Sequence, residues 1–245
     1  MPVESHVLLA LAVLAIAFLY SSVGHAGASG YIAVMALLGI ATAEIKPAAL
    51  VLNIFVASVT SYQFWRAGHF SWQLFWPFAM LAVPMAFLGG YLHLPTDFLK
   101  ILLGIVLLLS AFRLLVKPTT ELVIGRPCAP TALAVGAALG LLSGLTGTGG
   151  GIFLTPLLLF KRWATAKNAA AVSALFILLN SISGLTGTLL KNPHIPSFTI
   201  TLVAAAIIGG TAGSYFGSSR FDHTLIKRIL AIVLIIAGGK LVSGG

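Results

Sequence analysis

The chain has 245 residues, 59% of them hydrophobic and only 8% charged, and its mean hydropathy is +1.07. A soluble domain of this length cannot hide so much apolar surface, because much of a globular exterior must be polar or charged. The net charge of +9 is not gathered into a basic cluster interleaved with aromatic residues, so a nucleic-acid partner is not expected. The composition indicates a membrane protein.

Apolar segments follow one another almost without pause, and runs of about 18 such residues are typical of transmembrane helices. Helices are predicted at 5–23, 29–41, 46–66, 72–92 and 98–116, and then at 129–145, 150–161, 166–190, 197–218 and 224–242. The first segment lacks the preceding Lys or Arg of a signal peptide, so it is predicted to be a spanning helix. The segments 29–41 and 150–161 are too short to cross roughly 30 Å of hydrocarbon, so each is tilted or begins inside the membrane.

The two series are predicted to be repeats, with residues 1–120 forming the first and residues 121–245 the second. An offset of 121 residues places Gly30 on Gly151, and the short segment is second in both halves. Each half crosses an odd number of times, so the halves are inverted relative to each other, a frequent plan among transporters. The expected fold is an all-α membrane protein of about ten transmembrane segments in two inverted five-segment repeats, with short broken helices after glycine-rich turns.

The positive residues predict the orientation of the chain. One side of a ten-segment arrangement holds ten of the 14 Lys and Arg residues: Arg66, Arg113, Lys117, Arg126, Lys161, Arg162, Lys167, Arg220, Lys227 and Arg228. The other side holds four: Lys46, Lys100, Lys191 and Lys240. Cytoplasmic loops carry the excess of Lys and Arg. A multi-pass protein of the plasma membrane is therefore expected, with both termini outside.

Two glycine-rich turns are the main candidates for a binding site: "GHAGASG" at 24–30 and "GLTGTGGG" at 144–151. Each precedes a short helix, whose exposed N–H groups and positive dipole end suit an anion. The alternative for one such turn is close helix packing, but two turns at matching places favour a site. The predicted substrate-binding residues are His25, Gly27, Ser29, Gly30, Asn53, Thr146, Gly147, Thr148, Gly149, Gly150, Gly151 and Asn180.

The acidic residues support an anionic substrate by their positions. All five lie in predicted loops or at helix ends: Glu4, Glu44, Asp97, Glu121 and Asp222. No carboxylate remains in a predicted membrane interior, where carriers of cations commonly place one. The single cysteine, Cys128, excludes an internal disulfide and a multi-cysteine metal site, and neither a metal nor a cofactor is expected.

Three of the candidate residues admit more than one role. His25 is placed to bind the anion or to relay a proton, and equally to end a helix at the interface. Asn53 and Asn180 lie inside predicted helices, where an amide side chain needs several partners. Contact with the substrate and hydrogen bonding between helices are equally compatible with their positions.

The opening glycine turn, the segment "GLLSGLTGTGGGIFLTPLLL" and the two-half layout resemble the sulfite exporter TauE/SafE family of membrane permeases. The resemblance covers nearly the whole chain and implies transport of sulfur-containing anions such as sulfite, thiosulfate or organosulfonates. It places the glycine motifs of the family on Gly24, Gly27, Gly30, Gly147, Gly149, Gly150 and Gly151. Because no GxxxxGK[ST] nucleotide-binding motif occurs, transport is expected to be passive or coupled to an ion.

Other functions remain open on the sequence. The same turns fit a passive anion channel, which the sequence does not separate from a carrier working by alternating access. "GASG" at 27–30 matches the GxSG pattern of rhomboid-type intramembrane proteases, with Ser29 as nucleophile, but an enzyme is not expected because that serine needs a base within reach. The expected partners are a small anion and the lipid bilayer, and a coupling proton or cation and a homodimer are left open.

Overall fold

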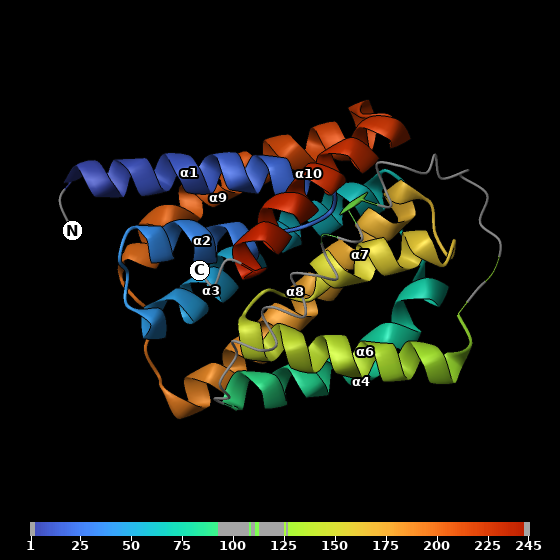
Figure 1. Cartoon of the computed structure of the whole chain (residues 1–245), viewed down its shortest axis with the longest axis horizontal. Helices are drawn as coiled ribbons and strands as arrows, with labels where there is room; N and C mark the ends of the chain where they lie inside the picture. The colour runs from blue at the N-terminus through green and yellow to red at the C-terminus, as the bar shows by residue number, and fades with distance from the viewer. Residues whose placement is uncertain (1–2, 93–107, 109–110, 113–124, 126, 243–245) are drawn as a thin grey trace.

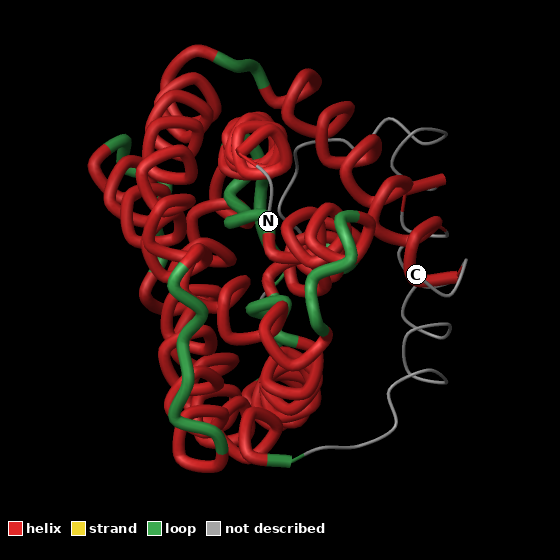
Figure 2. The backbone as a smooth tube through the Cα atoms, turned by 90° about the vertical axis from the view of Figure 1, so that its left-hand side faces the viewer, coloured by secondary structure: helices red, strands yellow, loops and turns green. Residues whose placement is uncertain are grey.

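The computed structural model describes residues 3–92, 108, 111–112, 125 and 127–242, and every regular element in these ranges is helical (Figures 1 and 2). In the first part of the chain the helices are α1 (Val3–Ser21), α2 (Ala28–Leu37), α3 (Thr42–Arg66) and α4 (Trp72–Tyr91). In the second they are α6 (Ala129–Thr146), α7 (Gly151–Phe160), α8 (Ala166–Lys191), α9 (Phe198–Tyr215), the π-helix η1 (Phe216–Arg220) and α10 (His223–Val242).

The helix order agrees with the expectation from the sequence. The largest shift of a helix start is in α3, which begins at Thr42, four residues earlier than predicted. Pro47 therefore lies within the helix rather than beside its end. The predicted segment 98–116 lies outside the described residues except for 108, 111 and 112, and the predicted boundary between the halves, at residue 120, lies outside them altogether.

Five described helices are long and apolar enough to cross a bilayer: Ala43–Arg66, Trp72–Tyr91, Ala129–Thr146, Ala166–Lys191 and Phe198–Arg220. In contrast, α2 and α7 have ten residues each. At 1.5 Å per residue such a helix is about 15 Å long, half the thickness of the hydrocarbon core. The prediction of two short broken helices is confirmed, and neither of them spans a bilayer by itself.

Two helix pairs lie on either side of a central pair. α1 packs along α9 at one edge, α4 packs along α6 at the other, and α3 contacts α8 between them (Figure 1). Within its most apolar 18-residue window, α8 is 61% buried, whereas α6 is 33% buried. The central helices are thus enclosed by protein, and the outer pairs present the apolar surface that lipid would cover.

Glycines set the close contacts in both outer pairs. In α6 they recur at every fourth residue, and a Cβ added at any of them would collide with a carbonyl oxygen of α4: Gly136 with Phe78, Gly140 with Ala82 and Gly144 with Ala86. α9 and η1 repeat the pattern against the carbonyl oxygens of α1 and the residue after it: Gly209 with Leu14, Gly213 with Phe18 and Gly217 with Ser22. Small residues at this spacing let helix backbones approach closely in a membrane.

Candidate functional site

The two glycine-rich turns share left-handed glycines at both ends, but Gly149, with φ of 78°, has no left-handed counterpart in the first turn. Gly24 and Gly27 bound the first turn with φ of 82° and 104°, and Gly147 and Gly150 bound the second with φ of 76° and 78°. These left-handed values favour glycine, since a Cβ would meet the backbone there. Gly27 and Gly150 are the N-caps of the short helices that follow the turns.

The equivalence of the turns differs from the one predicted. α2 and α7 begin at Ala28 and Gly151 and both have ten residues, so the structure matches them at an offset of 123 rather than 121 residues. His25 therefore corresponds to Thr148, and Ser29 corresponds to Ile152. The predicted offset pairs Gly30 with Gly151, whereas an offset of 123 pairs Gly24 with Gly147 and Gly27 with Gly150, four glycines that are all left-handed.

Each short helix presents unbonded backbone donors at its start. Neither cap glycine has a side chain to bond them, and the first N–H that donates a hydrogen bond to a carbonyl in α2 is that of Tyr31, which bonds the Gly27 carbonyl. In α7 it is Phe153, which donates to the Gly150 carbonyl. The N–H groups before these positions and the positive end of each helix dipole form an environment for negative charge.

The first turn reaches across to the second half through a histidine. The Nε2 atom of His25 lies 2.9 Å from the hydroxyl of Thr155 on α7. Thr155 in turn donates a hydrogen bond of 2.7 Å to the hydroxyl of Ser173 on α8. The backbone of Gly24 packs against Ala170, also on α8. One turn of the first half is thereby joined to the short helix and the central helix of the second.

The second turn, in turn, contacts the first half of the chain through α3. A Cβ added at Gly149 would lie 2.9 Å from Nδ2 of Asn53 on α3 and 3.1 Å from the hydroxyl of Ser181 on α8. At Gly147 it would lie 3.0 Å from the side chain of Lys46, also on α3. Gly149 therefore lies beside the polar groups of Asn53 and Ser181, and Gly147 lies beside the methylene stem of Lys46.

Several buried polar atoms of the described residues have no hydrogen-bond partner. Among them are Nδ1 of His25 in the first turn, Oδ1 of Asn53 and the hydroxyl of Ser143 on side chains beside the second turn, and both Oδ1 and Nδ2 of Asn180 on α8. His25 is 2% exposed and the other three residues are fully buried. Buried polar groups are nearly always satisfied, so such a group indicates a water or ligand that completes it. Of these atoms, Nδ2 of Asn180 and the Ser143 hydroxyl can donate a hydrogen bond to an anion, and no carboxylate is among the four side chains.

Lys46 is the cation beside the second turn. It is half-buried, and its ammonium donates a long hydrogen bond of 3.4 Å to the carbonyl of Gly90. Among the described residues it forms no ion pair, so its charge is available to an approaching anion. In the first turn the equivalent contact, with Gly24, is made by the small Ala170.

The comparisons with known proteins agree with this architecture. The model of the sulfite exporter TauE/SafE family matches residues 9–241. The chain belongs to this family. It is 41% identical over 238 residues to "Probable membrane transporter protein y4hK" of Sinorhizobium fredii, covering 95% of this chain and 96% of that protein. A match of 29% identity over 117 residues joins it to "Probable membrane transporter protein YunE" of Bacillus subtilis, covering 48% of this chain and 42% of that protein. No solved structure matches.

In this TauE/SafE transporter, only some of the predicted site residues lie close together. His25 and the Gly147–Gly150 turn meet α7, α8 and α3 as described above. Ser29 turns away to Tyr20, whose hydroxyl lies 3.0 Å from its own, and Thr146 donates to the Leu142 carbonyl of its own helix. Thr148 lies 2.9 Å from Thr146 between their hydroxyl oxygens.

Two further predicted residues, Gly30 and Gly151, allow close helix packing because they have no side chain. A Cβ at Gly30 would lie 2.6 Å from Ile16, and one at Gly151 would lie 2.5 Å from Ile177. Two residues of the site were missed in the sequence: Thr155, four residues into α7, and Ser143, one turn before the second glycine turn. Their only signal is a hydroxyl within an apolar run, which usually bonds its own helix.

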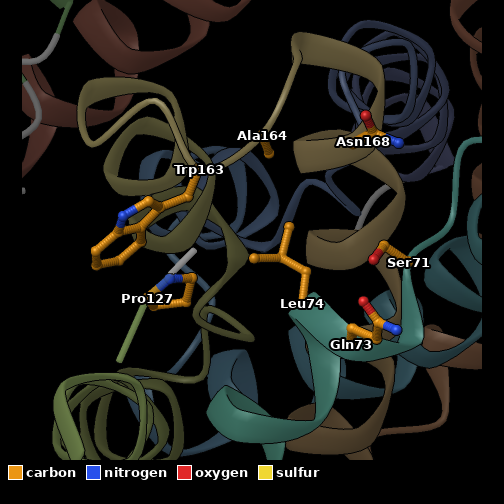
Figure 3. A pocket seen from close by; sticks show the side chains of 7 residues that line it. All are labelled: Ser71, Gln73, Leu74, Pro127, Trp163, Ala164 and Asn168. Atoms are coloured by element: carbon orange, nitrogen blue, oxygen red, sulfur yellow. The ribbon is translucent and has the colours of Figure 1, made fainter. Parts of the chain in front are cut away.

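A separate cavity of about 360 Å³ opens where α4 and α8 begin (Figure 3). It is lined by Ser71, Gln73, Leu74, Pro127, Trp163, Ala164 and Asn168, none of them a predicted site residue. The Asn168 amide is already bonded, since Nδ2 donates to the His69 carbonyl at 2.7 Å and Oδ1 accepts from Thr165 at 2.7 Å. In contrast, His25 in the first turn has an unpartnered ring nitrogen, and unpartnered atoms of Asn53 and Ser143 lie on side chains beside Gly149 and Gly150, so the turns are the better candidate site.

Proposed function

We propose that this TauE/SafE transporter carries a small sulfur-containing anion, such as sulfite, thiosulfate or an organosulfonate, held between the N-termini of α2 and α7. The observation that carries the proposal is the presence of unpartnered polar atoms on the fully buried side chains of Asn53 and Ser143, beside the uncapped start of α7. Backbone N–H groups and amides replace the water that a small oxyanion loses on binding.

The charge distribution supports an anion. The buried polar residues within the described ranges include no carboxylate and no Lys or Arg. The same ranges contain no group of three His, Cys, Asp or Glu side chains that would hold a metal ion. A cation entering this site would find no counter-charge, whereas an anion finds donors that need no compensating ion.

The mechanism we propose is alternating access between two inverted halves, residues 1–120 and 121–245. The support is an exchange of contacts between corresponding helices: α1 packs on α9 as α6 packs on α4, and α3 contacts α9 as α8 contacts α4. Such reciprocity is what a two-fold axis in the membrane plane produces. Rocking of the halves about the α3–α8 contact would expose the turns to each side of the plasma membrane in turn.

Two alternative functions are a passive anion channel and an intramembrane serine protease. A passive channel would use the same turns, and a flux assay separates it from a carrier. A serine protease needs a base on its nucleophile. In this structure the Ser29 hydroxyl faces Tyr20, while His25 faces Thr155, so the Ser–His pair is not formed.

The test uses the purified protein with sulfite, thiosulfate, sulfoacetate, sulfate and chloride. A ligand present at 100 times its Kd stabilises the native state by about 2.7 kcal/mol, which raises the melting temperature. Selective stabilisation by a sulfur oxyanion is expected. In proteoliposomes, unlabelled anion on the far side should accelerate uptake of the labelled anion, which a carrier shows and a channel does not. Equal responses to all five anions, or to none, would contradict the proposed substrate class.

A further inference from the structure

His25 combines deep burial with one bonded and one unbonded ring nitrogen. It is 2% exposed, Nε2 lies 2.9 Å from the Thr155 hydroxyl, and Nδ1 has no hydrogen-bond partner. It lies between the left-handed residues Gly24 and Gly27, so the backbone of the turn determines where the ring is held. A histidine kept only for packing would not need an unsatisfied nitrogen in a water-poor interior.

The hydrogen-bond chain assigns the proton on the ring. The Thr155 hydroxyl has one proton, which it donates to the hydroxyl of Ser173 at 2.7 Å. Thr155 must therefore accept from Nε2, which makes Nε2 the protonated nitrogen of the neutral ring. Nδ1 then carries a free lone pair, and no hydrogen-bond donor bonds it. The turn therefore holds a vacant proton acceptor beside the proposed anion site.

The surroundings of the ring contain no fixed charge. Tyr20 on α1 has its ring centroid 6.5 Å from that of His25, and Tyr31 on α2 bonds the neighbouring Ala26 carbonyl. From the second half the ring meets Thr155 on α7 and the backbone carbonyl of Gly151. No charged side chain of the described residues interacts with it. A proton on Nδ1 would therefore lack a counter-charge until an anion arrives.

We propose that His25 couples transport to protons: one proton binds at Nδ1 when the anion occupies the turns, and both leave together on the other side. This inference rests on the proposed anion site. The proton comes from water of the compartment to which the site is open, forms an N–H bond at Nδ1, and returns to water when the anion leaves. The positive imidazolium and the negative anion attract each other inside the protein. Moving them together therefore costs less free energy than moving either charge alone through the membrane interior.

The experiment measures anion and proton movement in the same proteoliposomes, with a pH-sensitive dye trapped inside. Radiolabelled thiosulfate and methanesulfonate are the probes, because both remain fully ionised near neutral pH and carry no titrating proton. The wild-type protein is expected to move about one proton with each anion and to accumulate anion against its gradient when the far side is alkaline. His25→Gln is expected to abolish the proton movement, so that the ratio of protons to anions falls to zero even though the anion flux also falls.

A matched control is His69→Gln, at a half-buried histidine whose Nε2 lies 3.1 Å from the Ser218 carbonyl and which belongs to neither turn. It should keep the wild-type ratio. Anion flux without proton movement in the wild-type protein would overturn the coupling and leave the proposed anion site standing. The same result follows from an unchanged ratio in His25→Gln. If neither probe nor any anion of the earlier panel binds or moves, the anion site and the coupling are both wrong.

Discussion

Asn53 on α3 and Ser181 on α8 meet beside Gly149, with the amide nitrogen of Asn53 3.4 Å from the Ser181 hydroxyl. The contact is long, both residues are fully buried, and Oδ1 of Asn53 has no partner. An amide placed only to join two helices would use both of its polar atoms. Because an amide oxygen accepts hydrogen bonds, the arrangement leaves room for a third group that donates one, such as a water of the anion's hydration shell.

Replacing Asn53 by aspartate should abolish anion binding. A carboxylate about 4 Å from a bound anion costs on the order of 4 kcal/mol at an effective dielectric constant of about 20, so affinity should fall by more than tenfold. Thermal stabilisation by the preferred sulfur oxyanion measures the effect. Ser58→Ala is the control on the same helix, since the exposed Ser58 hydroxyl bonds only the Ile54 carbonyl. Undiminished stabilisation of Asn53→Asp would place the anion elsewhere.

Comparing Gly150 with Gly68 separates the free-energy cost of a strained backbone from the loss of anion binding. Gly150 and Gly68 share a φ of 78°, but a Cβ would lie 3.0 Å from Phe176 at Gly150 and in open space at Gly68. Alanine at either position should cost about 1–2 kcal/mol of unfolding free energy through the left-handed backbone. Only Gly150→Ala should also lose anion stabilisation, as measured by melting with and without ligand. Equal anion responses in the two variants would show that the second turn does not hold the substrate.

The close α4–α6 contact should depend on its glycines. Leucine at Gly140 cannot fit against the Ala82 carbonyl without separating the helices, so Gly140→Leu is expected to prevent folding into a monodisperse protein. Ala138→Leu is the control, because Ala138 is exposed on the same helix. Size-exclusion chromatography in detergent distinguishes the two. A monodisperse Gly140→Leu protein with wild-type melting would contradict the observed packing.

Lys46 is expected to attract the anion to the second turn. Lys46→Gln should raise the anion concentration at half-maximal transport several-fold at low ionic strength, and less at high salt, because screening weakens the attraction. Lys191→Gln is the control: this exposed lysine is predicted on the same side of the membrane, with its ammonium 5.9 Å from the Tyr91 ring centroid. Equal changes in both variants would assign the effect to general surface charge.

Cys128 offers a test of the predicted orientation. Its Sγ lies 2.9 Å from the Thr131 hydroxyl, and this hydrogen bond lowers the pKa of the exposed thiol. A lowered pKa leaves more thiolate at neutral pH, so maleimide labelling should be fast there and should slow as the pH falls. A membrane-impermeant maleimide should label it only from the cytoplasmic side, next to Arg126. Thr131→Val should slow the reaction without changing the side, whereas labelling of intact cells would reverse the orientation.

The sequence by itself determined the class, the helix order and the family of this protein. Long apolar runs have one stable form in lipid, because a helix satisfies its own backbone hydrogen bonds, so composition and spacing sufficed to find the helices. The short helices α2 and α7 follow from length, since the predicted segments 29–41 and 150–161 are too short to span a bilayer.

The contacts between distant residues required the tertiary structure. The offset of 123 residues follows from two left-handed caps, and φ is not visible in a row of glycines such as Gly149–Gly151. His25 and Thr155 are 130 residues apart, and no local pattern indicates that their side chains meet. Ser29 matched a catalytic motif in sequence, yet it faces Tyr20. Polar side chains in apolar helices are oriented by packing between helices, which sequence periodicity does not resolve, so only the structure could distinguish site residues from ones that bond their own helix.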